Sequence, residues 1–106
     1  MRIKAAARLF AALGDETRLQ IAARLSAGGP MSMSQLTAGS KLTRQAIAKH
    51  LRVMEKARLL HRMRRGRESV CQLELQAIDD AQRSLDLISK QWDGALSRLR
   101  ALVEDK

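Results

Sequence analysis

The C-terminal third of the chain carries an apolar pattern that restricts the fold more than any other feature. Apolar residues recur there with alternating spacings of three and four, and no proline interrupts residues 76–104. The positions are Ile78, Ala81, Leu85, Ile88, Trp92, Ala95, Leu99 and Leu102. Such spacing is typical of a helix that packs along another helix. This helix would be roughly 40 Å long, longer than a small domain covers. The pattern therefore favours self-association over packing within one chain.

Positive charge is concentrated in one window of the sequence. The 106 residues contain 20 Lys+Arg and 11 Asp+Glu, a formal net charge of +9. Residues 41–67 hold ten of the basic residues and one acidic residue, Glu55, so their own net charge is also +9. Ordinary solvated surfaces interleave both signs, whereas a patch of one sign indicates a polyanionic partner. We therefore expect this window to bind nucleic acid.

The segments up to residue 57 predict a helix-turn-helix. Glycine-containing breaks and helix-capping residues delimit helices over residues 2–13, 16–26 and 34–38. A fourth helix follows over residues 44–57, with Thr43 as its N-cap. One side of this helix is apolar, and the other is a polar, basic stripe formed by Arg44, Gln45, Ala48, Lys49 and Arg52. Two short helices joined by a tight link, the second with such a stripe, are typical of a DNA-binding helix-turn-helix.

A basic β-hairpin is predicted directly after the fourth helix. Residues alternate with period two on both sides of Gly66. The tip of this hairpin is rich in arginine, at Arg64, Arg65 and Arg67. A hairpin in this position would be the wing of a winged helix, placed to contact the phosphate backbone or the minor groove.

The predicted fold is thus mainly α-helical with a small β-hairpin, a winged helix-turn-helix of four helices, a hairpin and a fifth helix. Residues 1–106 would form a single domain. Within it we expect a recognition helix over residues 43–57, a wing over 59–75 and a C-terminal dimerisation helix over 76–104.

Composition argues against several other classes. Aromatic residues make up 2% of the chain, too few for a sheet or barrel that stacks RNA bases. A single cysteine, Cys71, excludes an intrachain disulfide or a zinc site built on cysteine pairs, and favours a reducing, cytoplasmic setting.

No segment is apolar over the ~20 residues that span a membrane. Arg8 interrupts the basic, Ala-rich N-terminus, so we expect a helix there rather than a secretory signal.

An enzyme is not expected. The sequence contains no G-x-G-x-x-G, P-loop lysine, G-x-S-x-G or H-E-x-x-H motif. Its two histidines lie on separate predicted elements, so no catalytic set converges.

The order of four segments resembles the ArsR-type winged-helix transcriptional regulators. The segments are LFAALGDETRLQIAARL, MSMSQL, LTRQAIAKHLRVMEKARLL and RRGRESVCQLEL, and together they cover residues 9–75. Each motif is weak alone, but their order and spacing are specific. The resemblance implies a homodimer that binds an imperfect palindrome, usually a repressor released by an effector, with the terminal helices as its interface.

Departures from the family pattern predict a member without metal or other cofactor. Many members bind metal through a Cys-x-Cys-type motif on the third helix, whereas residues 32–36 here carry no thiol or imidazole. Others use ligands that include histidine on the C-terminal helix, and residues 76–106 contain none. For His50 we expect packing or a phosphate contact. Arg58 stands where the family usually has a helix-ending glycine, and we expect the helix to run slightly longer there instead of adopting a left-handed residue.

The predicted site has three parts. Base-edge contacts are expected from Arg44, Gln45, Ala48 and Lys49. Phosphate and wing contacts are expected from Thr43, Arg52, Arg64, Arg65 and Arg67. The dimer interface is expected at Ile3, Phe10, Ile78, Leu85, Ile88, Trp92, Leu99 and Leu102. The partners are double-stranded DNA and a second copy of the chain, with no membrane and an unknown effector. Cys71 is predicted to be a buried apolar thiol, with a redox sensor as the alternative.

Two other functions compete with a sequence-specific regulator. One is a non-specific architectural DNA-binding protein, which the Gln-Arg-Lys stripe disfavours because phosphate binding needs no such surface. The other is a protein-interaction module that has lost DNA binding, which the basic window disfavours.

Overall fold

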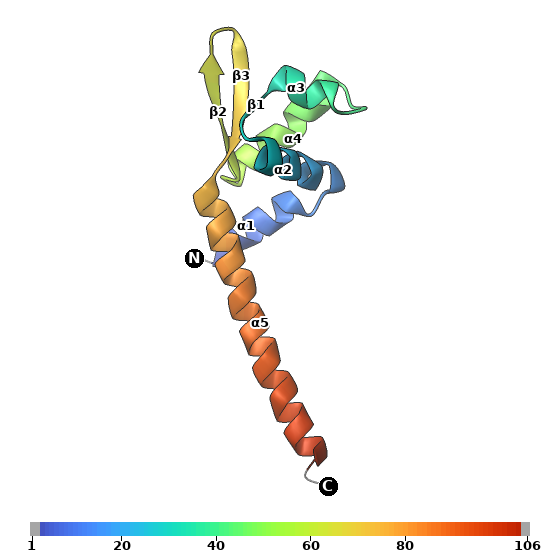
Figure 1. Cartoon of the computed structure of the whole chain (residues 1–106), viewed down its shortest axis with the longest axis vertical. Coiled ribbons are helices and arrows are strands. Elements are labelled where there is room, and N and C mark those ends of the chain that lie inside the picture. Colours follow the sequence, from blue (N-terminus) through green and yellow to red (C-terminus); the bar gives the residue numbers. More distant parts are fainter. Residues whose placement is uncertain (1–2, 105–106) are drawn as a thin grey trace.

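The predicted winged helix-turn-helix is confirmed. Residues 3–104, which the computed structural model describes, form five helices and a three-stranded antiparallel sheet (Figure 1). The helices are α1 (Ile3–Leu13), α2 (Glu16–Gly28), α3 (Met33–Ala38), α4 (Arg44–Lys56) and α5 (Leu75–Glu104). The strands are β1 (Met31–Ser32), β2 (Leu60–Arg65) and β3 (Glu68–Leu73).

Side-chain caps fix where three of the helices begin. The Asp15 carboxylate accepts from the backbone N–H of Arg18 at α2, and the Thr43 hydroxyl accepts from that of Ala46 at α4. At α3, the Ser32 hydroxyl accepts from the Gln35 backbone and the Gln35 side chain accepts in return from the Ser32 N–H. These caps satisfy backbone donors that a helix start leaves free.

The end of α4 differs from the prediction. The helix stops at Lys56, and Arg58 adopts a left-handed conformation with φ of 59° instead of extending the helix. The backbone N–H of Arg58 donates to the Glu55 carbonyl, and that of Leu59 donates to the Met54 carbonyl. This is the Schellman pattern of a helix end. It buries Leu59 against the core at once, which explains why the chain turns there despite the missing glycine.

The wing has the predicted hairpin, and the sheet has one strand more than predicted. Strands β2 and β3 pair from Leu60 opposite Leu73 to Arg65 opposite Glu68, with Gly66 at φ of 62° in the turn. Strand β1 adds to the other edge of β3. It is two residues long, so no period-two pattern could have revealed it.

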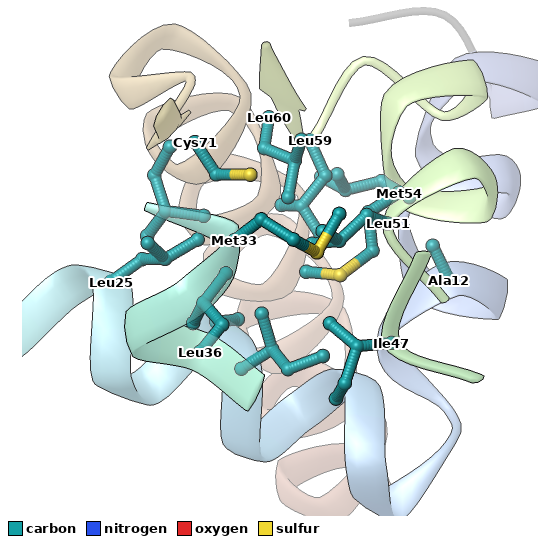
Figure 2. Packing of buried hydrophobic residues seen from close by; sticks show 14 of the residues in the cluster. Ala12, Leu25, Met33, Leu36, Ile47, Leu51, Met54, Leu59, Leu60 and Cys71 are labelled. Carbon is teal, nitrogen blue, oxygen red and sulfur yellow. The ribbon is translucent and has the colours of Figure 1, made fainter. Parts of the chain in front are cut away.

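The core joins α4 to every neighbouring element. Its side chains Ile47, Leu51 and Met54 point into one apolar cluster with Leu25, Leu36 and Cys71 (Figure 2). Each of these residues is buried. The opposite side of α4 is thereby held outward, which is the condition for a recognition helix.

Helix α1 packs on the core along one side and leaves most of its other side exposed. Leu9 and Ala12 are buried, whereas Ile3, Ala7 and Ala11 are exposed and Phe10 is partly buried against the core. Ile3, Ala7 and Ala11 therefore face solvent in this protomer.

Helix α5 projects away from the winged domain, and α1 crosses only its first turns (Figure 1). The molecule extends 69 Å along its longest axis. Among the described residues of α5, only Ala81 is buried. No helix within residues 3–104 is long and apolar enough to cross a lipid bilayer.

Candidate nucleic-acid interface

The polar, basic stripe of Arg44, Gln45, Ala48, Lys49 and Arg52, here called the recognition stripe, lies on the solvent side of α4. Arg44, Gln45, Lys49 and Arg52 are exposed, and Ala48 is half-buried between them and the core. Arg44 has one contact, 3.4 Å from its Nη1 to the Ser34 hydroxyl of α3. The structure therefore brings together all of the predicted base-edge residues on one surface.

The wing tip is a second basic surface. Arg64, Arg65 and Arg67 are exposed around the turn at Gly66. Glu68 lies directly opposite Arg65 in the hairpin, which places one carboxylate at the tip. The tip is separate from the recognition stripe, so the two surfaces could contact DNA at different places.

Arg62 makes contacts within the protein that the sequence analysis did not predict. Its Nε lies 2.8 Å from Glu55 Oε1 on α4, and its Nη2 lies 3.5 Å from the Ala48 carbonyl oxygen. The other nine basic residues of the 41–67 window are exposed. The one acidic residue in the window is thus paired within the protein. A signal existed in the pattern, since Arg62 is two residues after Leu60, a core residue, and so shares its side of β2.

His50 belongs to a polar cluster between α4 and the start of α2. Of the two roles expected for it, packing or a phosphate contact, this position fits packing. Its Nδ1 lies 3.4 Å from Arg18 Nη1 and 3.8 Å from Asp15 Oδ2. The backbone N–H of Arg18 holds the pKa of Asp15 below its ordinary value, and the nearby Arg18 and His50 charges act in the same direction. The cluster connects the middle of α4 to the start of α2.

Cys71 is buried, as predicted, and burial raises the pKa of its thiol above the ordinary value. The other residues with metal-binding side chains are dispersed. His61 Nδ1 pairs with Glu74 Oε1 at 2.5 Å at the base of the wing. Within residues 3–104, no three His, Cys, Asp or Glu side chains gather in a geometry that could hold a metal ion.

A cavity of about 830 Å³ lies between α1, the end of α4, the base of β2 and the start of α5. Arg8 and Lys56 line it together with Glu74 and Asp80, so its charges are mixed. None of Arg44, Gln45, Ala48, Lys49 and Arg52 lines it. The cavity is therefore distinct from the recognition stripe.

The fold and its two basic surfaces define a winged helix-turn-helix DNA-binding protein. A family model described as a helix-turn-helix domain matches residues 13–62. An HTH-type transcriptional regulator of Mycobacterium tuberculosis is 31% identical over 99 residues, which cover 93% of this chain and 89% of that protein. An HTH-type transcriptional regulator of Bacillus subtilis is 41% identical over 68 residues, covering 58% of this chain and 74% of that protein.

Among solved structures, an ArsR-like transcriptional regulator from Rhodococcus superposes with a TM-score of 0.81 at 32% identity. The superposition covers 93% of this chain and 92% of that one. The chain belongs to the ArsR-type winged helix-turn-helix transcriptional regulators. It is a DNA-binding regulator of transcription, not an enzyme.

Proposed function

We propose that this regulator acts as a homodimeric repressor on a palindromic operator in the cytoplasm. Helix α4 would lie in the major groove, and the wing would contact the backbone or minor groove beside it. The whole chain would act as one winged-helix domain. The observation that carries the proposal is the separation of two surfaces on one chain. The wing and α4 lie at one end of the molecule, and α5 projects toward the other (Figure 1). The basic stripe on α4 is exposed, and so are the apolar residues along α5.

The apolar stripe of α5 supports the homodimer. Leu85 is 54% exposed and Trp92 64% exposed, and Ile78, Ile88, Leu99 and Leu102 of the same spacing are also exposed. Contiguous apolar surface of this kind is rare on a monomer and marks an interface. A second copy supplies the same heptad pattern, so two α5 helices fit each other. Ile3 and Phe10 of α1 would extend the interface.

The side chains on α4 and the wing would have different roles. Arg44 and Lys49 suit guanine edges, Gln45 suits adenine, and Ala48 suits a thymine methyl group. Arg52, Arg64, Arg65 and Arg67 would bind phosphates, and Thr43 would add a hydroxyl beside its capping role.

We also propose that the repressor works without metal. Residues 32–36, where many relatives carry their metal-binding motif, offer no thiol or imidazole. Adding Zn²⁺ or arsenite should leave its affinity for operator DNA unchanged, and a release of the DNA by either would contradict this.

Nuclease footprinting on the DNA upstream of its own gene tests the function. A homodimer on a palindrome should protect two half-sites about 34 Å apart, or a multiple of that distance. Repression would appear as higher reporter expression from that promoter when the gene is deleted. Uniform, unsaturable coverage would instead identify an architectural protein, and no binding at low salt would contradict DNA recognition by this surface.

A further inference from the structure

Arg62 is set apart from the other basic residues of the window by where its side chain goes. It leaves β2 toward α4, where its Nε pairs with Glu55 at 2.8 Å. The side chain is 24% exposed. Its Nε atom is shielded from water and makes no hydrogen bond, so the contact with Glu55 is an ion pair. The wing is therefore joined to the recognition helix by a partly buried ion pair, in addition to the apolar core.

The two partners of Arg62 are seven residues apart on α4, the Ala48 carbonyl and the Glu55 carboxylate. They converge because helical side chains lean toward the N-terminus, whereas helical carbonyls point toward the C-terminus. The guanidinium spreads its charge over a planar fork, so it can pair with the Glu55 carboxylate while its Nη2 donates to the Ala48 carbonyl. The contact borders the recognition stripe, since Ala48 belongs to that stripe.

We propose that the Arg62–Glu55 pair is a positioning link that sets the wing against the recognition helix, so that both engage one half-site together. Neither side chain binds DNA itself. The tip residue Arg65 lies three residues beyond Arg62, about 10 Å along the strand. A change of angle at Arg62 therefore displaces the tip from its phosphate. The inference rests on the proposed operator binding.

Charge and positioning predict opposite results for Glu55→Gln. The substitution removes the one negative charge of the 41–67 window, which by electrostatics alone should tighten binding to any DNA. Loss of the link should instead weaken binding to the operator, since one wing contact per protomer is lost. We expect operator affinity to fall about tenfold, while affinity for a shuffled duplex stays equal or rises.

Arg62→Met and Arg64→Met form a matched pair of substitutions on β2. Both remove one positive charge, but Arg64 is exposed, whereas Arg62 is paired. A lost phosphate contact lowers the slope of log affinity against log salt by about one. Arg64→Met should lower that slope. Arg62→Met should weaken operator binding with the slope unchanged, and the exchange Glu55→Arg with Arg62→Glu should restore part of the affinity.

Fluorescence anisotropy with the footprinted operator and a shuffled duplex, over a salt series, measures these affinities. Thermal unfolding of each variant shows that it is folded. Operator binding by Glu55→Gln that equals or exceeds wild type overturns the link, as does a reduced salt slope in Arg62→Met. If the wild type protects no discrete site, the proposed function fails instead. In that case, residual dipolar couplings of the free protein test the link by comparing the angle between α4 and the wing in wild type and Glu55→Gln. An unchanged angle contradicts the link.

Discussion

The Nε of Arg18 in α2 donates to the Ala12 carbonyl oxygen of α1 at 2.6 Å. A second guanidinium nitrogen, Nη2, lies 3.4 Å from the Ala11 carbonyl oxygen. A helix leaves its last carbonyls without backbone partners, so Arg18 satisfies the end of α1 from the next helix. The same guanidinium contacts His50 on α4. One side chain thus connects three helices below the DNA-binding surface.

Arg18→Met should lower the free energy of unfolding by about 2 kcal/mol, because hydrogen bonds from a charged donor are lost and the Ala12 carbonyl at the end of α1 loses its Arg18 partner. Urea denaturation at one fixed protein concentration measures this, since dimerisation makes stability concentration-dependent. Arg83→Met is the matched control. Arg83 makes an exposed ion pair with Asp79 on α5, so its loss should change stability by less than about 0.5 kcal/mol. Equal effects of the two substitutions would contradict the capping role.

Asp15 should make stability depend on pH in the acid range. Its pKa in the folded protein is lowered, chiefly by the hydrogen bond from the Arg18 backbone. The ionised carboxylate therefore stabilises the fold above the ordinary pKa of aspartate, and this contribution is lost as the pH falls through the lowered value. Asp15→Asn keeps a capping oxygen but has no charge to lose. It should be less stable than wild type at neutral pH, and the gap should close in acid. A gap that does not vary with pH would show that the charge has no role.

Glycine breaks, helix caps and periodicity predicted the helices and wing well, because α4 and α5 each carry a stripe that recurs every three or four residues. Periodicity could not predict tertiary polar contacts. Arg62 has the same charge as its neighbours, and its partner Glu55 comes close only after the chain turns back at Arg58. That turn was itself mispredicted. Conformational preference disfavours a left-handed arginine by about 1 kcal/mol, but burial of Leu59 outweighs this cost.

Arg44 and Arg65 should differ in what their removal changes. Arg44→Ala should alter the ranking of operator variants at one base pair by about 1–3 kcal/mol, because it removes a base-edge contact. Arg65→Ala should weaken binding to all duplexes alike and lower the salt slope by about one. Anisotropy measurements with a panel of single-base operator variants separate these outcomes. If Arg44→Ala keeps both affinity and ranking, α4 does not read bases through this residue.

Cys71 should be nearly inert in the folded protein. It is fully buried, and burial raises the pKa of its thiol, so the reactive thiolate is scarce at neutral pH. Iodoacetamide should therefore modify it slowly in buffer and rapidly once urea unfolds the chain, as mass spectrometry can follow. Mild oxidants should leave DNA binding unchanged. Fast, complete modification of the native protein would favour the redox-sensor alternative.

Two leucines on α5 allow a matched test of the dimer. Leu85 lies on the heptad stripe and is 54% exposed, whereas Leu87 lies off the stripe and is 60% exposed. A leucine buried at an interface contributes about 2 kcal/mol, and a twofold dimer contains it twice. Leu85→Glu should therefore raise the dimer dissociation constant by roughly a thousandfold, and Leu87→Glu should leave it near the wild-type value. Sedimentation equilibrium measures both constants.

Because a monomer binds only one half-site, Leu85→Glu should also lose operator affinity, while its circular dichroism keeps the helical signal of the folded winged domain. A Leu87→Glu variant that dissociates as readily as Leu85→Glu would place the interface elsewhere on α5.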